Sequence, residues 1–207
     1  MNPARHVTAP EDRIPVLYRI TYGVGAFVNN LLGAASGGMM IVLNLGFGMD
    51  PSLVGWLGAL PRLTDAFTDP VMGYVSDNTR SRWGRRRPYI FSGAFITAVL
   101  FALLWRLPPG HSETFYFVYF LVGSILFFAA YTMFITPWVA LGYELTPDYN
   151  ERTRLMGTQN FIGQLAFTVS PWFLLIMNSG RFFRNEAGEP DQAAGAFGLA
   201  VVIGLVT

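Results

Sequence analysis

Two carboxylates stand four residues apart inside an apolar stretch of this chain. Asp65 and Asp69 share one face of a helix, one turn from each other, and Arg62 lies on the same side three residues before Asp65. Ionisable groups persist in hydrocarbon where they meet water, a counter-charge or an ion. The spacing therefore predicts a functional site that lines a cavity. Two carboxylates this close repel each other when poorly solvated, and a bound sodium ion or proton relieves that repulsion.

An ion pair between Arg62 and Asp65 is the structural alternative for this cluster. Opposite charges three residues apart on a helix are neighbours, so they can neutralise each other inside the membrane. Such a pair would leave Asp69 without a partner.

The composition is typical of a membrane protein. Hydrophobic residues make up 52% of the sequence, aromatic residues 15% and charged residues only 13%, whereas an ordinary soluble domain is about one quarter charged. Cysteine is absent, which excludes disulfides, thiolate zinc sites and thiol catalysis. His6 and His111 lie outside the apolar stretches, so we expect neither a histidine metal site nor a cofactor.

Six apolar stretches predict an all-α membrane protein. They cover residues of about 20–47, 53–75, 90–107, 115–141, 155–177 and 193–207. Pro61, Pro70 and Pro171 predict kinks within them, because proline cannot donate a backbone hydrogen bond. A membrane crossing needs roughly 20 residues, so the short last stretch predicts a truncated sixth helix.

The distribution of arginines indicates how these stretches are oriented. All fourteen basic residues are arginine, and ten of them lie in the N-terminal tail and in the loops after the second and fourth stretches. Because cytoplasmic loops carry such an excess, we expect the N-terminus and both loops to face the cytoplasm from the inner membrane. Six stretches over residues 1–207, grouped as three plus three, match the N-terminal half of a twelve-helix transporter with inverted repeats. The C-terminal half is expected to be missing.

Polar and aromatic side chains in two other stretches are candidates for contact with a solute. Asn29 and Asn30 interrupt the first stretch, and Tyr131, Thr132 and Trp138 lie in the expected cytoplasmic half of the fourth. Flat aromatic surface beside hydroxyl groups suits a polyol. The alternatives are that the asparagines only hydrogen-bond neighbouring helices, and that the outer aromatic residues of the fourth stretch only pack.

The segment from Arg62 to Pro88 resembles a known family. It reads R-x-x-D-A-x-x-D-P-x-x-G, followed by Asp77 and then S-R-W-G-R-R-R-P, and is similar to the glycoside-pentoside-hexuronide:cation symporter family of the major facilitator superfamily. The resemblance covers the chain nearly end to end. The other matching positions are Tyr22-Gly23-x-Gly25-Ala26-Phe27, Tyr131-Thr132, Pro137 and Glu151-Arg152.

The resemblance implies a cation site on the second stretch. In that family the two carboxylates, here Asp65 and Asp69, bind the coupling sodium ion or proton, and sodium is the only metal implied. Thr68 and Thr132 stand where the family places further oxygen ligands. Gating or structural roles are implied for five charged residues: Arg62, Asp77, Arg85, Arg86 and Arg152.

Departures from the family pattern gather on the solute side. Where the family has two aspartates and an arginine, this chain has Asn30, Ile135 and Asn160. Their loss removes charge-assisted hydrogen bonds to sugar hydroxyls, although the two amides can still bond a neutral sugar. We therefore expect Asn30 and Asn160, together with Tyr131 and Trp138, to contact the solute.

The leading hypothesis is a secondary active transporter that carries a sugar or glycoside with a sodium ion or proton by alternating access. One alternative is a proton-coupled carrier of another small organic solute, and another is a non-transporting membrane sensor or scaffold derived from a carrier. An enzyme is not expected, because no nucleophile with a base, metal ligand set or phosphate-binding loop stands in the stretches. The expected partners are the solute, the lipid bilayer and the missing C-terminal half, and no nucleic acid.

Overall fold

The computed structural model describes residues 8–106, 110–178 and 192–206, and every regular element within them is helical. The expected all-α class is thereby confirmed. Short helical turns, η1 (Pro10–Asp12) and the π-helical η2 (Val42–Gly46), stand before and after the first long helix. The α-helices are α1 (Val16–Ile41), α2 (Pro51–Asn78), α3 (Arg87–Leu104), α4 (Glu113–Glu144), α5 (Tyr149–Val169), α6 (Pro171–Asn178) and α7 (Gln192–Val206).

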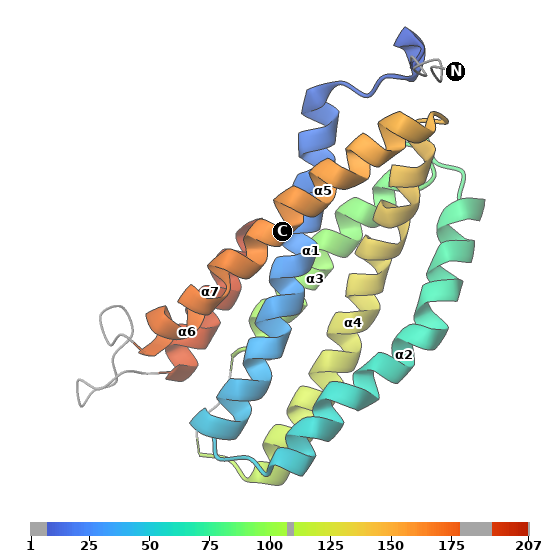
Figure 1. Ribbon diagram of the computed structural model, residues 1–207. Helices are drawn as coiled ribbons and strands as arrows, with labels where there is room; N and C mark the ends of the chain where they lie inside the picture. The colour runs from blue at the N-terminus through green and yellow to red at the C-terminus, as the bar shows by residue number, and fades with distance from the viewer. Residues whose placement is uncertain (1–7, 107–109, 179–191, 207) are drawn as a thin grey trace.

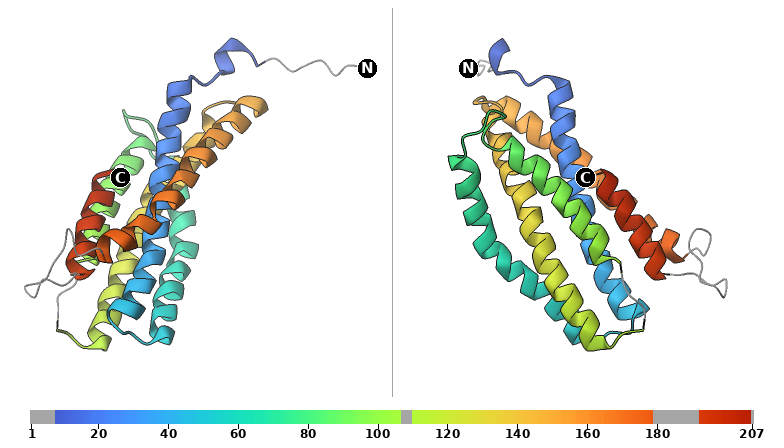
Figure 2. Two further views of the ribbon diagram at one scale, coloured as in Figure 1. Left: turned by 60° about the vertical axis from the view of Figure 1, so that its left-hand side comes forward. Right: turned by 180° about the vertical axis from the view of Figure 1, so that it is seen from behind.

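The long helices run roughly side by side and form an elongated bundle (Figure 1). Helix α1 packs along α5, α4 packs against both α2 and α3, and α7 lies on α3. Figure 2 shows that α2 curves along its length. Two prolines inside this helix, Pro61 and Pro70, account for the curvature, because each removes a backbone hydrogen bond and crowds the preceding turn.

Among the described residues, three segments are long and apolar enough to cross a membrane: Pro10–Gly46, Arg87–Leu104 and Glu113–Glu144. The expected second stretch lies in α2, which has 28 residues but carries three charges near its middle. The expected fifth stretch is divided between α5 and α6, where Pro171 starts a new helix. The sequence and these helices make the chain a multi-pass membrane protein. Six crossings stay a prediction, and residues 107 and 207 of the expected stretches lie outside the described residues.

Buried side chains form two clusters along the bundle. The larger one joins α1, α2, α3, α4 and α7, and its fully buried members include Leu32, Leu57, Phe101 and Phe120. Burying large apolar side chains in this way stabilises helix packing through close contact. The smaller cluster lies where α1, α4 and α5 approach one another, and it contains Tyr22, Trp138 and Leu155 along with residues that flank them.

One end of the bundle gathers most of the charged groups. The start of α1, the loop between α2 and α3, and the connection from α4 to α5 all lie at this end, at the top of Figure 1. We call it the charged end. Helix α5 begins here with a hydrogen-bonded cap, since the Asp148 carboxylate accepts a bond from the Glu151 amide at 2.9 Å.

Candidate functional site

Helix α2 carries the two aspartates on one unbroken segment. Asp50 caps its first turn by accepting a hydrogen bond from the Ser52 amide at 2.7 Å, and the helix continues through Pro61. The Thr64 hydroxyl donates to the Pro61 carbonyl at 2.6 Å. Asp65 therefore lies one turn beyond a proline bend, in a helix whose backbone groups are partly satisfied by its own hydroxyl side chains.

Arg62 and Asp65 form the ion pair that was the structural alternative for this cluster, but its geometry is loose. The guanidinium nitrogen and the carboxylate oxygen are 3.6 Å apart, and the Arg62 side chain is 59% exposed. The centre of the guanidinium also lies 4.5 Å from the ring centroid of Phe128 on α4, within the range of a cation–π contact. Arg62 thus divides its charge between a carboxylate on its own helix and an aromatic face on α4.

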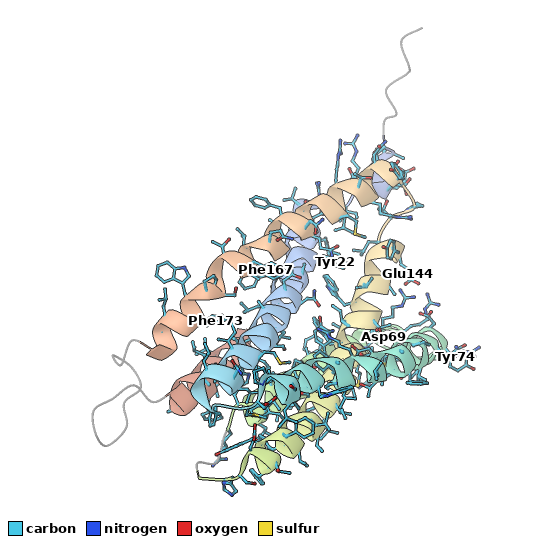
Figure 3. All side chains as sticks on the ribbon, turned by 60° about the horizontal axis from the view of Figure 1, so that its bottom comes forward. Tyr22, Asp69, Tyr74, Glu144, Phe167 and Phe173 are labelled. Atoms are coloured by element: carbon cyan, nitrogen blue, oxygen red, sulfur yellow. The ribbon has the colours of Figure 1, made fainter. Side chains whose placement is uncertain are left out.

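The ion pair leaves oxygen atoms of Asp65 and Asp69 without a cationic partner among the described residues. The Asp65 Oδ1 atom is buried and has no hydrogen-bond partner among the described residues. Asp69 is exposed, and no ion pair within the described part of the chain reaches it. Figure 3 shows Asp69 on the stretch of α2 that runs beside α4. The structural alternative for the cluster therefore accounts for Arg62 and one oxygen of Asp65 only.

Two threonines connect this stretch of α2 to α4. The Thr68 hydroxyl lies 3.4 Å from the Thr132 hydroxyl, and it also donates to the Thr64 carbonyl at 3.1 Å. Thr132 is only 2% exposed. The structure thus brings together the hydroxyls of Thr68 and Thr132, and Asp69 follows Thr68 directly in α2. Hydroxyl and carboxylate oxygens are the donor type that hard cations prefer.

Helix α1 contributes an amide pair that reaches α4. The Tyr131 hydroxyl donates to the Asn29 side-chain oxygen, and the Asn29 amide nitrogen donates to the Asn30 oxygen at 3.1 Å. Helix α5 approaches Asn30 at a glycine, because a Cβ atom on Gly163 would lie 2.9 Å from the Asn30 nitrogen. Asn30 and Tyr131 are therefore joined through Asn29. The two asparagines hydrogen-bond each other, and Asn29 also bonds α4. These bonds include the one that the structural alternative expected, between an asparagine and a neighbouring helix.

The other two expected solute contacts lie apart from this amide pair. Asn160 is exposed on α5, three residues before Gly163 and hence on the same side of that helix, but no hydrogen bond within the described residues joins it to Asn30. Trp138 is buried, and its ring stacks on Tyr22 at 4.6 Å between centroids and 16° between planes.

Packing explains the burial of Trp138. Phe134 lies near its ring at 6.4 Å between centroids, and a Cβ atom on Gly25 would come within 2.7 Å of the indole. Figure 3 shows Tyr22 between α1 and α4, with its hydroxyl donating to the Trp138 carbonyl at 3.4 Å. The described contacts thus place Trp138 in the smaller buried cluster and not beside Tyr131.

At the charged end, Arg86 is the centre of an ion-pair network. Its side chain is 9% exposed and contacts Asp77 at 2.5 and 3.1 Å and Glu144 at 3.1 Å. Arg85 contacts the same Glu144 oxygen at 2.9 Å. The expected Arg152 lies nearby in sequence on α5, where it donates to the Thr146 carbonyl at 3.1 Å. The network ties the loop between α2 and α3 to the end of α4, which Figure 3 marks at Glu144.

Glu151 holds the N-terminal segment against α5. The carboxylate is 1% exposed, accepts a hydrogen bond from the Ile14 amide at 3.2 Å and pairs with Arg154 at 2.6 Å. Burial opposes its ionisation, but the Ile14 amide, Arg154 and Arg19 together hold the pKa of the Glu151 carboxyl below its ordinary value. The Thr146 hydroxyl donates to the Asp12 carbonyl at 2.8 Å in the same contact.

Sequence reasoning named Asn29 as a candidate solute contact and Glu151 as a matching family position, but it assigned no role to Phe128 or Glu144. Partners far away in the chain explain why the contacts themselves were missed: Asn29 bonds Tyr131, Glu151 bonds Ile14, and Glu144 pairs with Arg85, at separations of 102, 137 and 59 residues. The only available signal for Phe128 was its position one turn before Tyr131 and Thr132, which were already singled out.

Comparison with known proteins gives the family. Residues 21–206 match the family described as MFS/sugar transport protein. The chain belongs to this family. An uncharacterized symporter of Synechocystis sp. is 31% identical over 95% of this chain and 36% of its own length. A putative glycoside/cation symporter of Escherichia coli is 31% identical over 77% of this chain and 33% of its own length.

An isoprimeverose transporter of Lactiplantibacillus pentosus is 28% identical over 95% of this chain and 40% of its own length. The motif on α2 resembles the cation symporters of the major facilitator superfamily, and these matches confirm that resemblance. The chain spans between 33% and 40% of the length of these relatives. Its similarity is to transporters, which fits the expectation that it is not an enzyme.

Proposed function

We propose that this chain forms the cation-binding half of a symporter that moves a sugar or glycoside together with a sodium ion or proton. The observation that carries the proposal is the incomplete pairing of Asp65 and Asp69 beside the contact between Thr68 and Thr132. Carboxylates that are neither fully paired nor fully hydrated retain capacity for a cation. The names of the relatives, a glycoside/cation symporter and an isoprimeverose transporter, support sugar as the solute.

The cation would bind between α2 and α4. Asp65 and Asp69 would supply charged oxygens, and Thr68 and Thr132 would supply neutral ones, so that one monovalent cation offsets one of the two negative charges. The loose partner Arg62 offsets the other. A site occupied in this way is close to neutral, which favours the transfer of an uncharged solute through the low-dielectric membrane interior.

The solute would bind on the neighbouring surfaces of α1, α4 and α5. The Asn30 amide nitrogen, which donates no hydrogen bond within the described residues, and the exposed Asn160 amide suit sugar hydroxyls, and the Tyr131 ring offers an apolar face. Trp138 does not belong to this proposal, because its ring is engaged by Tyr22. With the charged residues of the family pattern replaced by amides, binding of a neutral sugar would depend on hydrogen bonds and stacking.

Alternating access links the two ligands. A cation that stabilises the solute-binding arrangement raises the affinity for the solute, and the solute raises the affinity for the cation by the same factor. We propose that a C-terminal half supplies the opposite wall of the path. The term full-length transporter below means this chain together with that half, in a lipid bilayer.

The proposed orientation places the charged end in the cytoplasm and the protein in the inner membrane. The loop that contains Arg80, Arg82, Arg85, Arg86 and Arg87 supports this, since cytoplasmic loops are rich in arginine. Because the chain has no cysteine, a Ser81→Cys variant carries one exposed thiol in this loop. An impermeant maleimide should label it in inverted vesicles and not in intact cells. Labelling in intact cells would show the opposite orientation.

Uptake in vesicles tests the transport function. Full-length transporter in vesicles should accumulate labelled isoprimeverose or lactose when a sodium gradient or a proton gradient is imposed, and should lose this accumulation when an ionophore dissipates the gradient. Organic acids such as lactate serve as the comparison solutes. Accumulation of an acid but no sugar, driven by protons, would replace the sugar proposal with the carrier of another organic solute.

A transporter and a membrane sensor respond differently to loss of the carboxylates. In a symporter, Asp65→Asn and Asp69→Asn should each abolish gradient-driven uptake, because either change removes a charge from the cation site. A sensor or scaffold would tolerate both changes. The proposed function would be overturned if no gradient drives uptake and if both variants behave like the parent in expression and solute binding.

A further inference from the structure

Two consecutive residues of α4 make hydrogen bonds to two different helices. Thr132 meets Thr68 of α2 at the proposed cation site, and Tyr131 donates to Asn29 of α1 at the proposed solute site. Because Tyr131 and Thr132 share one helical backbone, a displacement of either side chain that moves the backbone moves the other as well. The two proposed sites are therefore connected by two hydrogen bonds that the α4 backbone joins.

Asn29 is engaged at both of its polar atoms. Its side-chain oxygen accepts from the Tyr131 hydroxyl, and its amide nitrogen donates to the Asn30 oxygen. Each polar atom of Asn29 thus has one protein partner, of the two that an amide oxygen or an amide nitrogen can take. Asn30 differs, because the described contacts use only its oxygen and leave its amide nitrogen, beside Gly163, for another acceptor.

We propose that Asn29 is a positioning residue, which does not itself bind solute but transmits the state of the cation site from Tyr131 to Asn30. This inference rests on the proposed function. A cation at Asp65 and Asp69 would draw the hydroxyls of the threonine pair toward itself and so shift α4. Tyr131 would then change its bond to Asn29, and the amide pair would reorient toward or away from the solute.

A single cysteine next to the amide pair can report this change without knowledge of the natural solute. Gly33 lies one turn after Asn29, it is exposed, and a Cβ atom placed on it would meet no atom within 4 Å. The full-length transporter with Gly33→Cys, in a background free of other cysteines, is treated with a maleimide. The labelling rate in sodium buffer is compared with the rate in potassium buffer at one pH. The rate in potassium buffer is then measured over a range of pH.

The expected result is a change in labelling rate of about fivefold or more on cation binding, the low end of usual coupling between two sites. Asn29→Leu removes both polar atoms, and Tyr131→Phe removes only the hydroxyl. In either variant the ratio of the rates with and without cation should fall towards one. Both changes together should do no more than either alone, because the two residues act through the same hydrogen bond.

Matched variants control for general damage to the helices. Tyr119→Phe removes a hydroxyl from the same helix α4, where it bonds the carbonyls of Leu103 and Arg106 at the other end. Asn44→Leu removes an amide that bonds the Met49 carbonyl after α1. Both should keep the full cation effect. A merely structural role of Asn29 would lower the melting temperature and leave the cation effect in place.

The variants separate failure of this inference from failure of the proposed function. Asp65→Asn should abolish the cation effect on labelling, and if it does not, the proposed cation site is wrong. Loss of the effect in Asp65→Asn together with its full retention in Asn29→Leu and Tyr131→Phe would leave the function standing and overturn the role of Asn29. A labelling rate that no cation changes in the parent would also overturn it.

Discussion

The charged end of the bundle and the middle of α2 use the same residue types in opposite ways. At the charged end, Arg86 contacts two carboxylates at distances from 2.5 to 3.1 Å, and Glu151 pairs with Arg154 at 2.6 Å. In α2, the pair between Arg62 and Asp65 is 3.6 Å long, and one oxygen of Asp65 has no hydrogen-bond partner among the described residues. The better-paired charges lie at the charged end, outside the apolar part of the bundle. Pairing matters least there for the cost of holding a charge.

This difference separates charges that hold the structure from charges that can bind a ligand. A carboxylate whose oxygens already accept short bonds gains little from a cation, since the cation would have to displace those donors. A carboxylate with an unused oxygen in apolar surroundings gains much more. Asp65 and Asp69 thus have the capacity that Glu151 lacks. The three predictions below test this distinction.

The largest expected effect belongs to the carboxylates of α2. Asp65→Asn and Asp69→Asn in the full-length transporter should abolish the sodium- or proton-dependent increase in solute affinity, an effect of about 5- to 150-fold where sites are coupled. For Asp65→Asn the melting temperature without cation should stay the same or rise, because the uncharged amide costs less to bury than the carboxylate. For Asp69→Asn it should not change, because Asp69 is exposed. Solute binding and thermal unfolding are measured with and without cation.

Asp50→Asn is the matched control for those two variants. It makes the same change at the start of α2, where asparagine is as good a cap as aspartate, so neither coupling nor melting temperature should change. A drop in melting temperature for Asp65→Asn with intact coupling would assign Asp65 to the structure and erase the difference between the two regions.

The second prediction concerns two adjacent arginines that share one partner. Arg86 is nearly buried, while Arg85 is 55% exposed, although both contact Glu144. Arg86→Met should lower the free energy of unfolding by about 1–2 kcal/mol, less than for a fully buried pair because Asp77 and Glu144 are half exposed. Arg85→Met should cost less than about 1 kcal/mol. Equal losses in thermal unfolding would show that burial does not set the strength of these pairs.

Much of the fold was predictable because apolar runs in the sequence are longer than most helices in soluble domains. The helices nevertheless extend beyond the apolar residues: α2 runs from Pro51 to Asn78, while the apolar stretch was expected at about 53–75. Capping residues such as Asp50 and Asp148 set where these helices begin. Because they are polar, a search for apolar stretches does not find them. The orientation in the membrane was inferred from arginines alone and stays a prediction.

The candidate site was predictable only where one helix contains all of it. Asp65 and Asp69 follow from helical periodicity, because residues four apart share a face, whereas Thr68 was indicated only by the resemblance to the family. The bond from Tyr131 to Asn29 links residues 102 positions apart and depends on how α1 meets α4. The burial of Trp138 similarly depends on a glycine of α1, which leaves room for the indole. Neither relation is encoded in local spacing.

The smallest expected effect is the dependence of Glu151 on pH. Its pKa in the folded protein lies below the ordinary value of 4.5, so its carboxylate adds stability above that pH. This contribution is lost as the pH falls below 4.5 and through the lowered pKa. Glu151→Gln keeps an oxygen for the Ile14 amide but loses the charge, and should cost about 1 kcal/mol near pH 7. The difference in melting temperature from the parent should shrink on acidification.

A second variant in the same contact shows whether that pH dependence comes from the carboxylate. Thr146→Val removes the hydroxyl that donates to the Asp12 carbonyl at 2.8 Å, so it loosens the N-terminal segment without removing a titratable group. Its loss of melting temperature relative to the parent should be the same at pH 7 and in acid. If Glu151→Gln behaves like Thr146→Val at every pH, then Glu151 acts as a hydrogen-bond acceptor whose charge is unimportant. The charged end would then owe its stability to hydrogen bonds and not to ion pairs, and short ion-pair distances there would no longer distinguish it from α2.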